Sequence, residues 1–92
     1  MISSFSDKDT RILYETGNCR RFAAVARVAL RKLDMLAAAT QVETLRVPPG
    51  NRLEKLSGDR EGQWSIRVND QWRICFKWIG VNAEEVEICD YH

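Results

Sequence analysis

Two arginines, Arg67 and Arg73, and the terminal pair Tyr91-His92 are the residues whose types could do chemistry together. A guanidinium stays charged at physiological pH, and its planar fork of donors matches the oxygens of a phosphate. An imidazole has an ordinary pKa of about 6.5, so His92 is the side chain best suited to carry a proton near neutrality. These four residues predict a site that binds a phosphate and moves a proton.

Such a site requires both arginines on one face of a sheet. Apolar and polar residues alternate over 64–68 and 72–78, which is typical of strands with one buried face. A three-residue turn over 69–71 sets Ile66 opposite Ile74 and Arg67 opposite Arg73, on the face away from Trp64. We expect that face to be open to solvent. Like charges directly opposed cost stability unless another group lies between them.

A further strand follows around residues 86–89. Setting Trp78 opposite Val86 keeps the apolar residues on one face and places Arg73 opposite Tyr91, which extends the arginine pair into a row of three. A shift of two residues also respects the faces, so both registers stay open.

The first half of the chain predicts helices. Ser6, followed by acidic residues at 7 and 9, marks a helix start, and Gly17 marks its end. Apolar residues recur at helical spacing over 21–39, and a short helix is expected over 41–46. Short strands are expected over 1–5 and 52–56. The fold class is therefore α+β, with N-terminal helices packed on a small antiparallel sheet.

Composition sets the broad class. The chain has 92 residues, 45% hydrophobic and 29% charged, which predicts one folded domain over 1–92. No apolar stretch approaches the roughly 20 residues that span a bilayer, and no signal peptide is visible, so we expect a cytoplasmic protein.

The cysteines argue against two kinds of site. Cys19, Cys75 and Cys89 are odd in number and lack CxxC spacing, and the chain has one histidine, which disfavours a disulfide framework and a zinc site. We expect Cys75 and Cys89 to be small buried neighbours.

The net charge of +1 hides an uneven distribution, because residues 45–80 carry +3 and residues 81–92 carry −4. A local basic patch is therefore possible. The basic residues considered for it are Arg46, Arg52, Lys55, Arg60, Lys77, Arg20 and Arg21.

One stretch resembles a known family. Residues 58–76 read Gly-Asp-Arg-Glu-Gly-Gln-Trp-Ser-Ile-Arg-Val-Asn-Asp-Gln-Trp-Arg-Ile-Cys-Phe, and the chain ends Asp90-Tyr91-His92. Together with the length and the helical first half, these segments are similar to HigB-type toxins of the RelE superfamily, from bacterial type II toxin–antitoxin systems. The chain departs from the pattern at Glu54 and Ser57, where family members often carry His and Lys.

The resemblance implies a RelE-like fold and cleavage of mRNA in the ribosomal A site, without a metal or other cofactor. It places the catalytic arginines on Arg67 and Arg73 and the C-terminal aromatic residue and histidine on Tyr91 and His92. It makes the seven basic residues named above the proposed contacts to RNA and the ribosome, where phosphate contacts add affinity but no sequence information. It also implies neutralisation by a HigA-like helix-turn-helix antitoxin, whose complex with the toxin binds operator DNA.

Two other functions stay open. ParE-type toxins of the same superfamily bind DNA gyrase without cutting RNA, and a plain RNA-binding module would use the basic residues alone. The arginine–tyrosine–histidine set favours the nuclease, since neither alternative needs a proton carrier.

Overall fold

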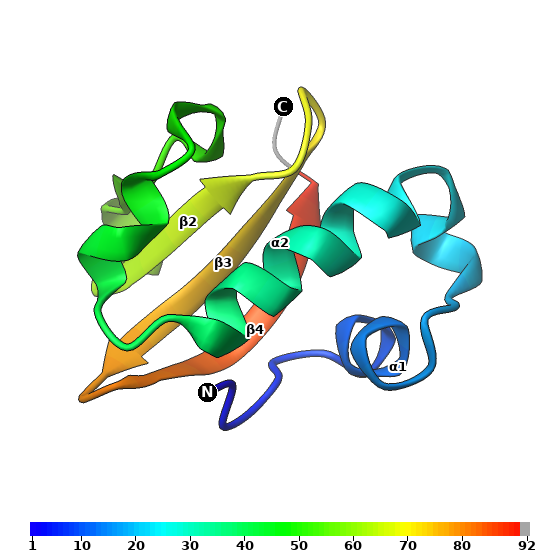
Figure 1. The fold of residues 1–92 in the computed structure, drawn as a ribbon, viewed down its shortest axis with the longest axis horizontal. Coiled ribbons are helices and arrows are strands. Elements are labelled where there is room, and N and C mark those ends of the chain that lie inside the picture. The colour runs from blue at the N-terminus through cyan, green and yellow to red at the C-terminus, as the bar shows by residue number, and fades with distance from the viewer. Residues whose placement is uncertain (91–92) are drawn as a thin grey trace.

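In a computed structural model, which describes residues 1–90, two α-helices pack on a four-stranded antiparallel sheet, as the sequence predicts (Figure 1). The α-helices are α1 (Lys8–Thr16) and α2 (Ala26–Ala38). The strands are β1 (Glu54–Lys55), β2 (Gln63–Arg67), β3 (Trp72–Ile79) and β4 (Asn82–Asp90). Short 3₁₀ segments are η1 (Arg20–Val25), η2 (Val42–Arg46), η3 (Pro49–Asn51) and η4 (Gly58–Arg60).

Helix α1 begins and ends close to the predicted residues. The cap is Asp7 rather than Ser6, and its carboxylate accepts a hydrogen bond from the Thr10 amide at 3.1 Å. Gly17 ends the helix with φ at 79°, a left-handed conformation that glycine adopts at little cost.

The single helix expected over 21–39 is wrong in its first part. Residues 20–25 form η1, and regular α-helix starts only at Ala26. The break lies at Phe22, which has φ −110° and ψ 16°. Its ring is buried and meets Trp72 edge-on at 5.3 Å between centroids, so packing on β3 decides the backbone conformation here.

The strand expected over 1–5 is reduced to two isolated bridges. Ile2 and Phe5 pair in parallel with Ala83 and Val86, and this segment covers the outer edge of β4. The strand expected over 52–56 is likewise confined to the two residues of β1.

The sheet is a meander in the order β1-β2-β3-β4. Between β2 and β3 the predicted register is confirmed, with Arg67 opposite Arg73. Between β3 and β4 the register with Arg73 opposite Tyr91 is wrong, because Arg73 lies opposite Cys89. Over residues 72–75 the structure has the alternative register, shifted by two residues, which the sequence left open.

A tight turn and a bulge explain the shift. The chain reverses over the two residues between Ile79 and Asn82, where we expected a longer loop. An extra residue in β4 opposite the step from Cys75 to Lys77 then restores the faces, and Glu85 there has φ at 52°.

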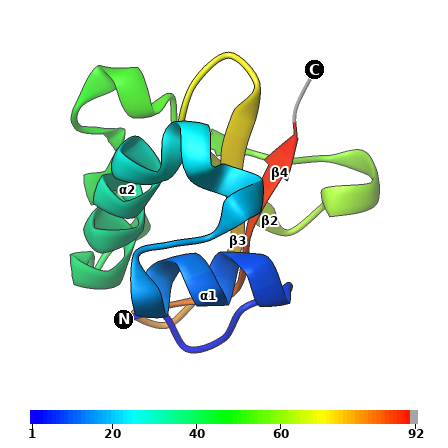
Figure 2. The ribbon, with the colours of Figure 1, turned by 90° about the vertical axis from the view of Figure 1, so that its right-hand side faces the viewer.

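The sheet has two covered faces. Helix α2 lies on one face, over a core that includes Leu33, Leu36, Ile66 and Ile74. Trp64, Trp72 and Trp78, which stand at the apolar positions of the alternating strands, pack against this core. Figure 2 shows the yellow-green segment with η4 on the opposite side of the sheet from α2. Within residues 1–90, no helix is long and apolar enough to span a bilayer.

Candidate active site

The guanidinium groups of Arg67 and Arg73 donate hydrogen bonds to different acceptors. Arg67 sits at the end of β2, and its Nη2 donates to the carboxylate of Asp70 in the adjoining turn. Arg73 reaches in the other direction along the strands, and its Nε donates to Ser65 Oγ at 2.8 Å. Each guanidinium therefore has its own partner, which reduces the repulsion expected from two opposed cations.

The two arginines differ in exposure. The side chain of Arg67 is 34% exposed and that of Arg73 is 9% exposed. The expectation of a solvent-open face is therefore wrong at Arg73. The chain after η3 crosses this face, and the carbonyl of Arg52 accepts a hydrogen bond from Arg73 Nη2 at 2.7 Å.

The loop that supplies this carbonyl is fixed by a buried asparagine. Asn51 Nδ2 donates to the carbonyl of Leu45 at 3.0 Å, and Asn51 Oδ1 accepts from Lys32 Nζ of α2. Burial lowers the pKa of Lys32, and the guanidiniums of Arg31 and Arg67 lower it further. The charges of Arg31 and Arg67 thus lie close enough to Lys32 of α2 to act on it electrostatically.

A carboxylate also lies beside Arg73. Glu54 of β1 pairs with Ser65, so it shares the face of the arginines, and its Oε2 is 4.0 Å from Arg73 Nη2. Its side chain is about half exposed, so this acid faces solvent while it offsets the charge of Arg73.

The cysteines are buried neighbours on this same face, as predicted. Cys75 and Cys89 are diagonal rather than directly opposed, and the Cys89 thiol donates to the Glu87 carbonyl at 3.9 Å. The interaction between the two thiols lowers the pKa of Cys75, to which Arg60 and Arg73 also contribute, and raises the pKa of Cys89 together with burial. Among residues 1–90, no cluster of three or more His, Cys, Asp or Glu side chains is arranged to hold a metal.

The residues proposed for RNA or ribosome binding do not form one patch. Arg60 and Lys77 lie on the face of the arginine pair, but each is ion-paired, with Glu87 at 2.7 Å and Glu85 at 2.6 Å. Lys55 lies over the ring of Trp64, 5.6 Å from its centroid, and so belongs to the other face.

Arg46 and Arg52 are exposed near the loop around η3. Arg46 pairs with Glu43 within η2. The backbone of Arg52 is left-handed, with φ at 46°, and its carbonyl accepts the hydrogen bond from Arg73.

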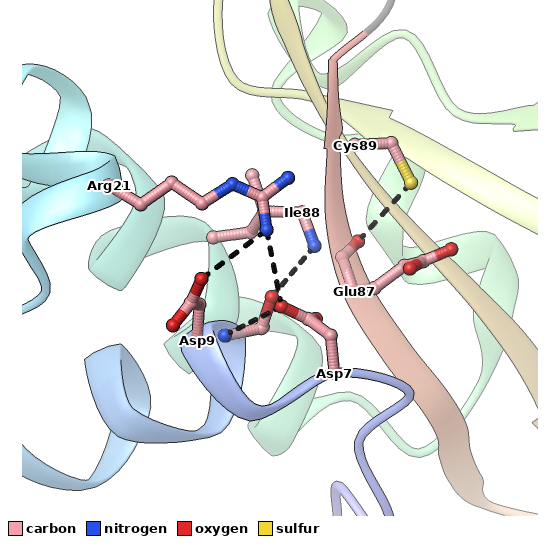
Figure 3. A network of polar contacts seen from close by, with 7 residues as sticks. Asp7, Asp9, Arg21, Glu87, Ile88 and Cys89 are labelled. Carbon is pink, nitrogen blue, oxygen red and sulfur yellow. Dashed lines mark hydrogen bonds and ion pairs between the residues drawn. The ribbon is translucent and has the colours of Figure 1, made fainter.

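Arg20 and Arg21 begin η1, which leads directly into α2. Arg21 pairs with Asp7 at 3.7 Å and Asp9 at 3.5 Å, so the acidic start of α1 neutralises it (Figure 3). Its guanidinium also lies 5.8 Å from the centroid of Trp72. Arg20 is exposed.

Tyr91 and His92 lie outside the described residues. The last described residue, Asp90, pairs with Trp72 and accepts a hydrogen bond from Gln71 Nε2 at 3.2 Å. Strand β4 therefore ends beside the 69–71 turn, next to the end of β2 that carries Arg67.

Sequence reasoning missed Ser65 and Asn51, both of which are fully buried. Alternation did place Ser65 on the face of Arg67, and the confirmed register makes it the diagonal neighbour of Arg73. No comparable sequence signal marks Asn51, because its partners come from α2 and from its own loop.

Solved structures with this fold are bacterial toxins. The YoeB–YefM complex from Staphylococcus aureus matches with a TM-score of 0.58 and 16% identity, over 100% of this chain and 98% of that one. The YoeB/ParE toxin from Agrobacterium tumefaciens matches with a TM-score of 0.57 and 17% identity, over 99% of this chain and 100% of that one. The fold is thus that of small RelE-like toxins.

Sequence comparison narrows this class. Residues 3–92 match the family of HigB-like toxins, described as RelE-like toxins of type II toxin–antitoxin systems. Toxin HigB-1 of Vibrio cholerae is 41% identical over 81 residues, which is 86% of this chain and 85% of the relative. Endoribonuclease HigB of Proteus vulgaris is 38% identical over 94 residues and the full length of both. The chain belongs to the HigB family of toxins, and the predicted resemblance is confirmed.

Proposed function

We propose that this chain is an endoribonuclease that cleaves mRNA on the ribosome without a metal cofactor, and thereby inhibits translation. The observation that carries the proposal is the cross-strand pair of Arg67 and Arg73 on the sheet face opposite α2. Family membership and the name of the Proteus vulgaris relative, an endoribonuclease, support the same activity.

The proposed chemistry is an in-line attack. The 2′-hydroxyl of the RNA attacks the adjacent phosphate, a P–O bond forms, and the bond to the 5′-oxygen of the next nucleotide breaks. Arg67 and Arg73 stabilise the charge that develops on the phosphate oxygens, which is often the largest catalytic contribution. His92 accepts the proton of the 2′-hydroxyl and donates one to the departing 5′-oxygen, and Tyr91 stacks on a base or holds a phosphate oxygen.

The ribosome has a role in this proposal because the protein's described face offers no single basic surface for RNA. An mRNA held by the ribosome arrives in a fixed conformation, which supplies orientation that this small sheet does not. Arg46, Arg52, Lys55, Arg60, Lys77, Arg20 and Arg21 remain the proposed contacts to RNA and ribosome.

The partners follow from the family. A toxin of a type II system is paired with an antitoxin, and we propose a helix-turn-helix protein similar to HigA, whose complex with this chain binds operator DNA. Such systems act inside the cell, so the proposed location is the cytoplasm.

Primer extension on mRNA from cells that express the protein tests the activity. Breaks within translated codons are expected for the parent and absent for Arg67→Ala and Arg73→Ala. Breaks in untranslated RNA as well would contradict the role of the ribosome. Intact mRNA with growth arrest would favour a target such as DNA gyrase.

A further inference from the structure

Ser65 is a fully buried polar residue to which the proposed reaction assigns no task. It lies in the middle of β2, diagonal to Arg73 on the same face. Its Oγ accepts the hydrogen bond from Arg73 Nε at 2.8 Å. A hydroxyl buried in a strand is costly unless it is hydrogen-bonded, and this one is satisfied by a charged donor.

The carbonyl of Arg52 binds the same edge of the guanidinium. It accepts from Arg73 Nη2 at 2.7 Å, and Nη2 lies on the side of the guanidinium that carries the Nε hydrogen. Arg52 has φ at 46°, which is uncommon for a residue with a side chain. Asn51 directly precedes Arg52, and its buried side-chain amide is hydrogen-bonded to Lys32 and to the Leu45 carbonyl. These bonds hold the backbone in place just before Arg52.

Two acceptors on one edge fix the plane of the guanidinium, not only its position. An arginine side chain is flexible, and a charge that must meet a developing phosphorane stabilises it best when no reorganisation is needed. The half-exposed carboxylate of Glu54, 4.0 Å from Nη2, lies at the same nitrogen. The side chain is therefore oriented before any substrate is bound.

We propose that Ser65 is a positioning residue, and that its hydroxyl and the Arg52 carbonyl form a receptacle that orients the Arg73 guanidinium for the phosphate. This inference deepens the proposed function and rests on it. The receptacle is specific for a planar cation with two donors on one edge, which an ammonium group does not provide.

The first measurement compares cleavage by purified parent, Ser65→Ala and Ser3→Ala on ribosomes programmed with mRNA. Ser3 is exposed on the N-terminal segment and serves as the matched control. Loss of one hydrogen bond to a charged group predicts a kcat about tenfold lower for Ser65→Ala, with KM unchanged. Ser3→Ala is expected to match the parent.

The second measurement separates positioning from a structural role. Free guanidinium ion at millimolar concentration is expected to restore part of the cleavage by Arg73→Ala, while methylammonium is not. In Ser65→Ala/Arg73→Ala, half-maximal rescue is expected at about tenfold higher guanidinium, because the receptacle has lost one acceptor. Circular dichroism checks that each variant is folded at the assay temperature.

The outcomes distinguish the two levels of the proposal. A parent that leaves mRNA intact, or an Arg73→Ala variant that cuts like the parent, would refute the nuclease function itself. If Arg73→Ala is impaired, an unchanged kcat for Ser65→Ala would overturn the positioning role alone. Coincident rescue curves, or no rescue of Arg73→Ala by guanidinium, would overturn it as well.

Discussion

At the residue scale, Arg67 and Arg73 have the same charge but different surroundings, and substitution separates activity from stability. Arg67→Ala is expected to lower the cleavage rate by roughly 10²–10³-fold, as for other groups that stabilise transition-state charge. Its free energy of unfolding is expected to change by less than about 1 kcal/mol, because the pair with Asp70 is on the surface. Single-turnover cleavage and urea denaturation measure the two effects.

Arg73→Ala provides the contrast. It leaves Ser65 Oγ and the Arg52 carbonyl without this donor in a buried place, which costs about 1–3 kcal/mol in addition to the loss of cleavage. Equal losses of stability in the two variants would mean that Arg67 is as deeply engaged as Arg73, contrary to their exposure.

A second residue-scale prediction concerns the proton carrier. Deletion of His92 alone is expected to reduce cleavage sharply while the thermal midpoint stays the same, because β4 ends at Asp90. The pH–rate profile of the parent is expected to show a group with a pKa near about 6.5 that the deletion removes. Undiminished cleavage by the truncated chain would exclude this role.

At the element scale, α1 is fastened to the outer edge of β4 by one buried hydroxyl. Thr10 Oγ1 accepts a hydrogen bond from the Ile88 amide at 3.0 Å. Thr10→Val keeps the shape and leaves that amide unpaired, which is expected to cost about 1–3 kcal/mol and to speed hydrogen exchange at Ile88. Thr16→Val is the matched control, since the Thr16 hydroxyl is exposed, and its change should be within about 0.5 kcal/mol.

Strand pairing shows what sequence could and could not predict. The β2–β3 register followed from alternation, because a slip by one residue would expose the apolar face. The β3–β4 register did not, because alternation left two registers open, and the structure reaches the one shifted by two residues through a tight turn and a bulge at Glu85. The arginine pair was therefore predictable, and the row with Tyr91 was not.

The residues that hold Arg73 were harder to predict for a different reason. Ser65 is marked by its place on the strand, but the Arg52 carbonyl reaches the guanidinium through a loop with one left-handed residue. Its position depends on Asn51 and on Lys32 from another element, and side-chain type and spacing carry no information about such a contact.

Lys32 connects α2 to this loop and gives a prediction about pH. Its pKa is lowered, so the unfolded chain binds more protons between the lowered pKa and the ordinary value of about 10.4. The stability of the parent relative to Lys32→Met is therefore expected to rise with pH in that window. Urea denaturation at about pH 8 and about pH 10 measures the difference.

Lys77→Met is the control for this prediction. Its pKa is raised by the hydrogen bond and ion pair with Glu85, so its contribution to stability is retained below the ordinary pKa and lost only above it. The free energy of unfolding of the parent, relative to the variant, could rise with pH as much for Lys77→Met as for Lys32→Met. That result would show that general alkaline titration, and not burial of Lys32, causes the effect.

At the scale of the whole molecule, the main core and the arginine pair lie on opposite faces of one sheet, and a small buried cluster of Leu56, Cys75 and Cys89 shares the face of the arginines. The residues that fill the space under α2 come from the same strands that carry the arginines, one position along. A change on the core face therefore reaches the site through the backbone of β2 and β3, or through Lys32 of α2 and the loop that Asn51 holds. Strands β2 and β3 each carry both core residues and site residues. Even so, we expect stability and catalysis to respond to different substitutions.

Truncation of the core tests whether residues 1–92 unfold as one domain. Leu36 is fully buried on α2, and Leu36→Ala is expected to cost about 2–5 kcal/mol. If the helices and the sheet form one cooperative unit, tryptophan fluorescence and far-ultraviolet circular dichroism will shift together by the same amount. Below the new transition, cleavage should stay near the parent rate, because Leu36 lies on the face away from Arg67 and Arg73. Separate transitions for the two probes would instead show that the helices melt from a sheet that folds without them.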